Sequence, residues 1–267
     1  MSESTPVNPA EQGLEVRTYF VRDRNVLWAQ ADFSDLFVDF YLHLSDQKIK
    51  PNPENAAMFK RALAAFTLHC ASQPRNVMTA WTMNFQKPLV NLFLVGDNEL
   101  GSVTGRVFDD NVKELPDNIF YADVVRGKQP PRRSTVNFTG SDPLLAVEAF
   151  YTQSEQRTAR YFQLGEDSFA MLTEHPDSDM DWLCGLTVEA VKKLDDTETL
   201  TLLETRVARW HCGCNQERMM QVLLPAMKQD PVALFGDDQK IEIRCPRCAA
   251  RHVITREALE AYAVENP

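Results

Sequence analysis

Cys212-Gly213-Cys214, followed after thirty residues by Cys245-Pro246-Arg247-Cys248, decides how the C-terminal part of this chain folds. Two short cysteine pairs at this separation are how one tetrahedral Zn²⁺ collects four thiolates from a small domain. Residues 210–267 are too few to bury a stable core without such a cross-link. The spacing therefore predicts a C-terminal zinc-binding domain over 210–267 that holds one Zn²⁺ per chain. Its predicted ligands are Cys212, Cys214, Cys245 and Cys248.

The residues around the cysteine pairs predict two strands and a helix. Ile241-Glu242-Ile243-Arg244 alternates apolar and polar side chains, and His252-Val253-Ile254-Thr255 is the predicted returning strand. Asn215 is the predicted N-cap of a helix that stops at Pro225. The positive end of this helix lies beside Cys214, where it favours the thiolate form that binds a metal.

The other candidate ligands are expected to have structural roles. His211 and His252 are possible ligands, but four cysteines already complete the coordination of a structural zinc, so we expect both histidines to flank the site. Cys70 and Cys184 lie on the apolar faces of predicted helices, where we expect small core residues. A second hypothesis treats Cys245-Pro246-Arg247-Cys248 as an oxidoreductase dithiol. Such a dithiol normally opens a helix in a βαβ unit, whereas this pair lies between two predicted strands.

The spacing within each pair also suggests a redox switch. Cysteines two or three residues apart can approach disulfide distance, and Gly213 relaxes the backbone of the tighter pair. A structural Zn²⁺ contributes about 10–16 kcal/mol to folding a small domain. Two local disulfides would stabilise it by about 2 kcal/mol each and would tie nothing across the thirty residues. Oxidation is therefore expected to unfold the domain.

Residues 1–172 predict a domain of mixed strands and helices. Glu15 to Ala29 is rich in β-branched and aromatic residues, and helices are predicted from Pro53 to Ala71 and from the cap Asp142-Pro143. Alternating apolar residues and turn signals mark the strands between these helices. The pattern predicts an α+β fold with a mainly antiparallel sheet and packed helices, after a loose arm over residues 1–14.

Residues 173–209 are a predicted acidic helical linker. Residues 174–204, called the acidic segment below, carry nine acidic and two basic side chains, a net charge of −7. Like charges this dense oppose a compact helix, so the segment is predicted to form one marginal helix. We expect the C-terminal domain to supply apolar contacts to Leu186, Val191 and Leu194 and so to keep the helix folded.

Composition and charge exclude several classes of protein. The 267 residues are 44% hydrophobic and 25% charged, and no apolar run reaches the length of a membrane span. A net charge of −10 argues against a nucleic-acid partner. The N-terminus has neither a basic nor an apolar leader, which predicts a cytoplasmic protein without a secretion signal. The sequence contains neither a Gly-rich phosphate loop nor a Gly-x-Ser-x-Gly motif, so no catalytic motif predicts an enzyme.

Two distant motifs occur together in this chain. The first is Cys212-Gly213-Cys214-Asn215-Gln216-Glu217-Arg218 with the later Cys245-Pro246-Arg247-Cys248, and the second is Phe150-Tyr151-Thr152-Gln153-Ser154-Glu155-Gln156. Both are similar to motifs of the heat shock protein 33 (Hsp33) family of redox-regulated holdase chaperones. The proline that usually follows the second motif is missing, and so are the Gly-Gly and Gln-x-x-Pro elements expected before the linker.

The resemblance implies a cytoplasmic, non-enzymatic chaperone for unfolding proteins. Its four cysteines would hold zinc when reduced. When oxidised they would form next-neighbour disulfides, Cys212 with Cys214 and Cys245 with Cys248, with loss of zinc. Oxidation would unfold the tail and linker, expose apolar surface to unfolded client proteins and allow a homodimer to form.

Alternative interpretations remain for both motifs. The cysteine domain could be a zinc ribbon that binds nucleic acid or a partner protein, although a nucleic-acid ribbon should be basic and residues 210–267 carry seven basic against eight acidic side chains. A thiol-disulfide oxidoreductase is the third possibility. On its residues alone, Gln-Ser-Glu-Gln is predicted to be the polar last turn of the second helix, with its amides bonded to the free carbonyls of that helix.

Overall fold

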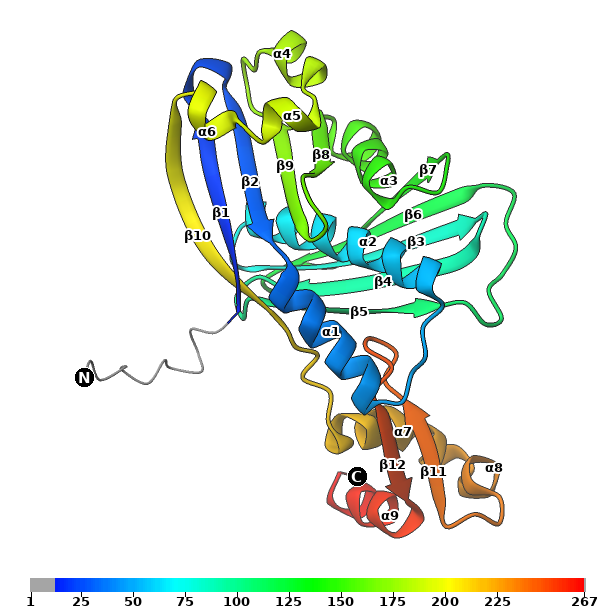
Figure 1. Cartoon of the computed structure of the whole chain (residues 1–267). Coiled ribbons are helices and arrows are strands. Elements are labelled where there is room, and N and C mark those ends of the chain that lie inside the picture. Colours follow the sequence, from blue (N-terminus) through cyan, green and yellow to red (C-terminus); the bar gives the residue numbers. More distant parts are fainter. Residues whose placement is uncertain (1–12, 267) are drawn as a thin grey trace, which may run out of the picture. The chain divides into compact units, whose positions relative to one another are not determined.

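The computed structural model describes residues 13–266 in two compact units, one that ends at His211 and one that begins at Cys212 (Figure 1). The arm predicted over residues 1–14 lies outside the described residues except for Gly13 and Leu14, and Leu14 is already the first residue of a strand. Within the described range, no helix combines the length and the apolar character needed to cross a membrane.

Unit 1, the part up to His211, is built on one large sheet. Its strands are β1 (Leu14–Val21), β2 (Val26–Asp32), β3 (Val77–Gln86), β4 (Leu89–Asp97), β5 (Ser102–Phe108), β6 (Asn118–Arg126), β7 (Arg132–Phe138), β8 (Ala159–Gln163), β9 (Ser168–Glu174) and β10 (Leu200–Trp210). They lie in the order β7-β6-β3-β4-β5-β10-β1-β2-β9-β8. Every neighbouring pair is antiparallel except β5 and β10, which are parallel.

Over residues 13–211, six α-helices pack on this sheet and complete the predicted α+β fold with its mainly antiparallel sheet. They are α1 (Ser34–Asp46), α2 (Pro53–Ser72), α3 (Pro143–Phe150), α4 (Met180–Gly185), α5 (Val188–Val191) and α6 (Leu194–Thr197). Figure 1 shows α2 running across the sheet, and its buried residues lie in the main hydrophobic core together with residues of β1, β3, β4 and β9.

Helix α2 begins and ends close to where the sequence predicts. The Asn52 side chain accepts hydrogen bonds from the backbone N–H groups of Glu54 and Asn55, at 2.9 and 3.4 Å, and Pro53 occupies the first turn. This cap satisfies donors that have no partner within the helix. The face that carries Phe59, Leu63, Phe66 and Cys70 is buried, as the helical spacing predicts.

Helix α3 starts at its predicted cap, but it ends differently from the prediction. Asp142 accepts from the N–H of Leu144 at 2.9 Å, with Pro143 at the first position. The helix then widens into a π-helical turn over Tyr151–Glu155. The Gln153 amide donates to the carbonyl of Asn137 in β7 at 3.1 Å, and not to a carbonyl of its own helix. The turn therefore ties α3 to the edge strand of the sheet.

The acidic segment forms three short helices, α4 to α6, and the start of β10. Its charge pattern predicts one marginal helix instead, so that prediction is wrong. Its buried residues Leu183, Leu186, Val191 and Leu194 all lie in one hydrophobic cluster of unit 1. The expectation that the C-terminal domain supplies their apolar contacts is wrong, because unit 1 supplies them. The sheet residues of this cluster, called the covered face below, are Val21, Val26, Trp28, Phe162, Ala170 and Leu172.

Unit 2, from Cys212 onward, contains three helices and a two-stranded sheet. They are α7 (Gln216–Gln229), α8 (Pro231–Phe235), β11 (Lys240–Arg244), β12 (Arg251–Thr255) and α9 (Arg256–Glu265). The prediction that α7 stops at Pro225 is wrong, because the helix continues to Gln229. Proline removes one backbone hydrogen bond from the helix. Packing of Met219 and Met227 in the small core of unit 2 holds the helix together on both sides of this gap.

The two cysteines outside the pairs differ in exposure. Cys70 is buried, as predicted, and burial raises the pKa of its thiol above the ordinary value. Cys184 is exposed, so the expectation of a core residue is wrong at this position. Helix α4 buries the adjacent residue Leu183, and neighbouring residues on a helix do not face the same side.

Replacing Leu183 tests how strongly the acidic segment is held in unit 1. Leu183 is fully buried in the cluster with the covered face, so we expect Leu183→Ala to lower the free energy of unfolding of the segment by about 2–5 kcal/mol. Leu145→Ala is the matched control, because Leu145 is 56% exposed and should change stability by less than about 0.5 kcal/mol. Amide hydrogen exchange of residues 177–199 measures the effect, and equal protection in the two variants would contradict it.

Candidate metal centre

The sulfur atoms of four cysteines converge in unit 2. Those of Cys212, Cys214, Cys245 and Cys248 all lie within 4.8 Å of one another. The first two precede α7, and the last two lie in the turn between β11 and β12. Cys245 and Cys248 are buried, while Cys212 and Cys214 are half-buried. The fold thus brings together all four residues that the sequence predicts as ligands.

The turn that carries Cys245 and Cys248 is fixed by its own backbone. Cys245 and Ala250 are joined by a hydrogen bond of 2.8 Å from N–H to carbonyl, and the N–H of Ala249 donates to the carbonyl of Cys245 at 2.9 Å. Ala249 has a φ of 63°, in the left-handed region that closes such a turn. The backbone N–H groups of Arg247 and Cys248 face the Cys245 sulfur, and that of Ala250 faces the Cys248 sulfur.

The segment that carries Cys212 and Cys214 is fixed by the start of α7. Asn215 caps the helix as predicted, since its side chain accepts from the N–H of Arg218 at 2.9 Å. The Arg218 guanidinium donates to the carbonyl of Gly213 at 2.8 Å, and Gly213 has a φ of 66°. Gly213 is therefore held in a conformation that suits glycine, with one cysteine on each side of it.

Arg218 is a residue of the site whose role the sequence analysis does not assign. Its spacing from Gly213 nevertheless carries a signal. An arginine in the first turn of a helix can reach back to a carbonyl just before the helix. Here that carbonyl lies between two of the cysteines, so Arg218 positions the first pair.

The geometry fits a tetrahedral metal ion held by four sulfurs. The sulfur of Cys212 lies 3.7 Å from that of Cys245, and the sulfur of Cys214 lies 3.6 Å from that of Cys248. Metal–sulfur bonds of about 2.3 Å in a tetrahedron place the sulfurs about 3.8 Å apart. Four soft sulfur donors in this arrangement select zinc or iron over magnesium or calcium. The four cysteines could therefore hold a metal ion.

The electrostatics of the centre favour one thiolate, because the pKa of the Cys245 thiol is lowered while hydrogen bonds among the sulfurs and burial raise those of Cys212, Cys214 and Cys248. Hydrogen bonds from Cys212 and Cys248 lower the pKa of the Cys245 thiol far below its ordinary value, and the backbone N–H groups of Cys248 and Arg247 lower it further. A metal ion binds the thiolate and not the thiol. Donors that stabilise the charged sulfur therefore also prepare the centre for a cation.

The two histidines near the pairs are not part of this group of sulfurs. His211 is exposed, and its backbone N–H donates to the carbonyl of Val103 in β5 at 3.0 Å, so this residue belongs to unit 1. His252 lies in β12 opposite Ile243 of β11. Among the residues that the structure describes, the four cysteines form the one group of ligand atoms close enough to hold a metal.

Comparison with known proteins relates the chain to one family by sequence. Residues 166–255 match the family model of the Hsp33 protein. A 33 kDa chaperonin of Proteus mirabilis is 28% identical over 114 residues, which cover 43% of this chain and 37% of that protein. The 33 kDa chaperonin of Bacillus subtilis is 32% identical over 76 residues, which cover 28% of this chain and 26% of that protein. The chain thus matches between about a quarter and a little over a third of the length of these relatives.

The fold gives a wider match. The crystal structure of a 33 kDa chaperonin, a heat shock protein 33 homologue from Thermotoga maritima, superposes with a TM-score of 0.73 and covers 96% of this chain and 99% of its own. The sequences are 14% identical, so this match concerns the fold alone. The predicted resemblance is confirmed: residues 166–255 are similar in sequence to the Hsp33 family, and nearly the whole chain is similar in fold to an Hsp33 homologue.

Proposed function

We propose that this chain is a redox-regulated holdase that binds unfolding proteins when its cysteine centre is oxidised. The observation that carries the proposal is the convergence of four sulfurs from two segments thirty residues apart, in a chain similar to proteins named 33 kDa chaperonins. Its partners would be unfolded or partly folded client proteins, and its working compartment the reducing cytoplasm, where such a centre stays loaded with metal. The oxidised form would be able to pair as a homodimer.

In the reduced state, we propose that Cys212, Cys214, Cys245 and Cys248 hold one Zn²⁺. The ion would neutralise the buried thiolates and tie the start of α7 to the turn between β11 and β12. The core of unit 2 is small, so a structural zinc would supply much of its folding free energy. The buried apolar residues of that core are Met219, Met227, Phe235, Ile254 and Leu259.

In the oxidised state, we propose disulfides between sequence neighbours, Cys212 with Cys214 and Cys245 with Cys248. Sulfurs from different pairs lie 3.7 and 3.6 Å apart, so bridges across the pairs are the competing outcome. Cross-pair bridges would preserve the connection between the two segments. Neighbour bridges would break it and release the metal, and only this outcome unfolds unit 2.

The route from the cysteine centre to the acidic segment would run through β10. This strand links α6 to Cys212, and its last residue, Trp210, packs against Phe40 at 5.3 Å and Phe59 at 6.3 Å between ring centres. Loss of order beyond Cys212 would first disturb the packing of Trp210 against these two phenylalanines. We propose that it then loosens the acidic segment and uncovers the covered face, which supplies the apolar surface that a holdase needs.

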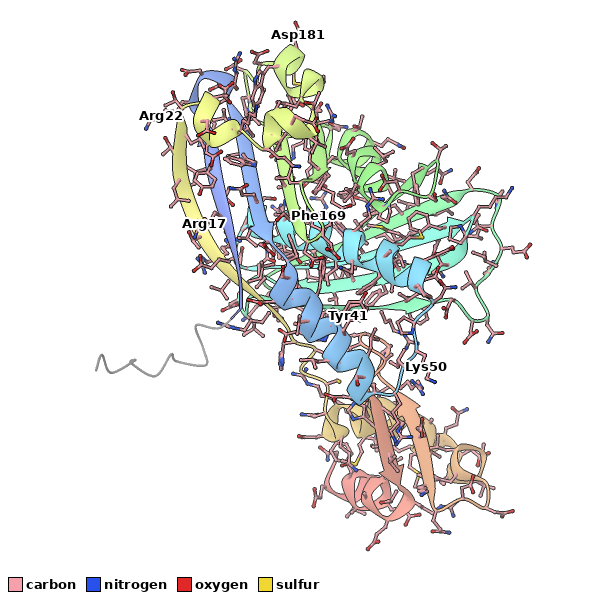
Figure 2. All side chains as sticks on the ribbon, in the orientation of Figure 1. Arg17, Arg22, Tyr41, Lys50, Phe169 and Asp181 are labelled. Carbon is pink, nitrogen blue, oxygen red and sulfur yellow. The ribbon has the colours of Figure 1, made fainter. Side chains whose placement is uncertain are left out.

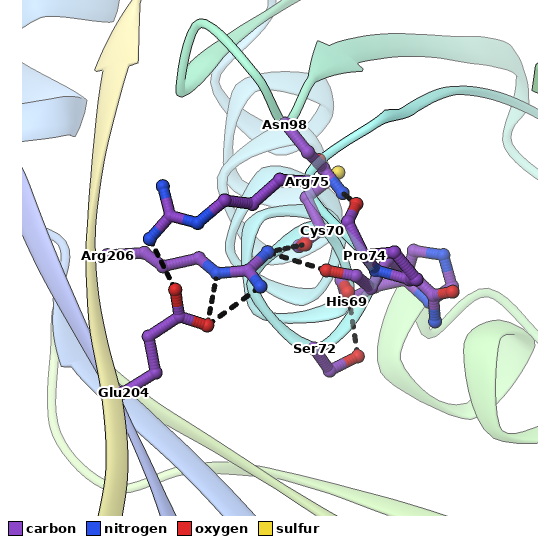
Figure 3. Close-up of polar contacts among 9 residues, drawn as sticks. His69, Cys70, Ser72, Pro74, Arg75, Asn98, Glu204 and Arg206 are labelled. Carbon is purple, nitrogen blue, oxygen red and sulfur yellow. Dashed lines mark hydrogen bonds and ion pairs between the residues drawn. The ribbon is translucent and has the colours of Figure 1, made fainter. Parts of the chain in front are cut away.

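Arginines of unit 1 oppose this release. The Arg206 guanidinium reaches from β10 to the carbonyls of Gln73 at 2.6 Å and Cys70 at 3.4 Å, at the C-terminal end of α2 (Figure 3). Glu204 lies between Arg206 and Arg75 and pairs with both. These contacts offset part of the negative charge of the acidic segment. These arginines therefore help to hold the C-terminal end of the acidic segment in place while β10 stays ordered.

Two other functions are weaker candidates. A nucleic-acid-binding zinc ribbon needs a basic surface, and the tail carries more acidic than basic side chains. A thiol-disulfide oxidoreductase would use Cys245 and Cys248 at the start of a helix, whereas both lie in a turn between strands. The absence of DNA or RNA binding at low salt, and of dithiol turnover, would separate the holdase from both.

The metal content tests the reduced state. We expect one zinc per chain in the reduced protein, and less than a tenth of that in Cys245→Ala, because three sulfurs leave the coordination incomplete. Cys184→Ala is the matched control and should keep its zinc, since Cys184 lies outside the cluster. Elemental analysis measures the content. Full zinc occupancy in Cys245→Ala would contradict the ligand set.

The disulfide pairing tests the oxidised state. Peroxide treatment should join Cys212 to Cys214 and Cys245 to Cys248, with zinc released in step with loss of thiols. Cys70 should stay reduced because it is buried. Mass mapping of proteolytic fragments identifies the bridges. A predominance of bridges between Cys212 and Cys245, or between Cys214 and Cys248, would contradict the mechanism.

Chaperone activity and local order test the function as a whole. Oxidised protein should suppress aggregation of a thermally unfolding client, while the zinc-loaded reduced protein should not, and reductant with zinc should reverse the effect. Amide exchange should become fast in residues 177–199 and 212–266, whereas α2 and β3 stay protected. Suppression of aggregation with unchanged protection of 177–199 would show that the client binds elsewhere.

A further inference from the structure

The acidic segment is seated on the covered face by apolar contacts and by charge. Leu183, Leu186, Val191 and Leu194 complete a cluster whose other buried members belong to β1, β2, β8 and β9. Tyr19 and Trp28 stack at 5.1 Å between ring centres within the same cluster. The segment therefore occupies the surface that the proposed function makes available to client proteins.

Arg24 provides the first charged contact with the segment. It lies in the short turn between β1 and β2, and its guanidinium pairs with Asp179 at 2.7 Å and Glu198 at 3.3 Å. The ring of Trp182 lies 5.3 Å from the same guanidinium. These three partners belong to the acidic segment. When the segment leaves, Arg24 loses two carboxylates and an aromatic ring together.

Arg160 provides the second contact of a charged side chain with the segment, and this contact is to backbone carbonyls. This residue of β8 lies 5.1 Å above the ring of Phe162 and donates to the carbonyls of Cys184 at 2.7 Å and Leu183 at 3.3 Å. Its remaining ion-pair partner is Glu148 of α3, at 3.8 Å. Departure of the segment removes the closest acceptors of Arg160 and leaves a more distant carboxylate.

The turn between β1 and β2 holds the helical part of the segment, α4 to α6, on both sides. The N–H of Asp179 donates to the carbonyl of Arg24, and the N–H of Arg22 donates to the carbonyl of Thr199, each at 3.0 Å. Arg22, in this turn, and Asp181, on α4, lie at the same end of unit 1 (Figure 2). The residues on either side of α4 to α6 thus meet the positively charged turn, while the helices between them cover the apolar surface.

We propose that the covered face, once open, selects client segments that resemble the acidic segment: leucine, valine or tryptophan side chains flanked by aspartate or glutamate. The inference rests on the proposed function and names its client class. The reason is that Arg24 loses two carboxylates when the segment departs, and an acidic apolar client replaces both the apolar contacts and these ion pairs, whereas the backbone of any client can supply carbonyl acceptors to Arg160. A basic apolar client would replace only the apolar ones.

The preference would act against the overall charge of the protein. The chain carries a net charge of −10, so long-range electrostatics favour a basic peptide over an acidic one. A preference for the acidic peptide must therefore come from local contacts. The folded segment also competes with such clients from within the chain, at an effective concentration that a free peptide has to exceed. The segment would thus act as an internal competitor.

Binding of two matched peptides tests this inference. The first has the sequence of residues 177–199, and the second carries lysine in place of Asp179, Asp181 and Glu198. Fluorescence anisotropy with oxidised full-length protein should give about fivefold tighter binding of the acidic peptide, the size expected of two half-exposed ion pairs. Equal binding, or tighter binding of the lysine peptide, would overturn the inference.

Variants of the turn locate the preference. Arg24→Gln should bind the two peptides within twofold of each other, while Arg24→Lys should retain most of the preference. Arg22→Gln is the matched control, because Arg22 lies in the same turn and its side chain donates to the Thr201 hydroxyl, not to a carboxylate. A preference that survives in Arg24→Gln would overturn the assignment.

Aggregation assays separate this inference from the proposed function. If oxidised wild-type protein does not suppress aggregation of any client, the proposed function fails, whatever the peptides do. If it suppresses aggregation but shows no preference between the peptides, the function stands and the charge selection is wrong. Retained suppression by oxidised Arg24→Gln, with its preference for acidic peptides lost, supports both.

Discussion

Pairing of β10 with two other strands holds unit 1 together. On one side β10 is antiparallel to β1 along Leu200–Ala208, and on the other it meets β5 at only two positions, Arg209 opposite Ser102 and Trp210 opposite Val103. The strands before and after β10 in the sheet order form separate antiparallel groups. The continuity of the sheet therefore depends on one strand, and that strand ends two residues before Cys212.

Features fixed by local sequence were predictable. The predicted caps Asp142 and Asn215 follow from short side chains that satisfy backbone donors in the first turn of each helix. The convergence of the cysteines follows from their spacing, because a small domain needs a cross-link to fold. In both cases the residues that determine the structure are close together or of one chemical kind.

Features fixed by distant partners were not predictable in the same way. The acidic segment looked unstable because its counter-charges, such as Arg24, lie more than 150 residues earlier in the chain. Helix α7 continues through Pro225 because packing on both sides outweighs the lost hydrogen bond. Cys184 appeared to be a core residue, although the adjacent Leu183 takes the buried position. The spacing of apolar residues predicts that one face of a helix is buried, but it does not identify the element that packs on that face.

The register of β1 and β10 has a consequence for the order in which the molecule is made. Thr18 lies opposite Glu204, so a strand near the start of the chain waits for a partner that the ribosome adds some 186 residues later. At about 5–20 residues per second this delay lasts about 10–40 s, during which one edge of β1 is open to other chains. Closure of the sheet therefore waits until β10 has been made. The first cysteine of the metal centre, Cys212, follows within a few residues, and until then the edge of β1 is open to pairing with other chains.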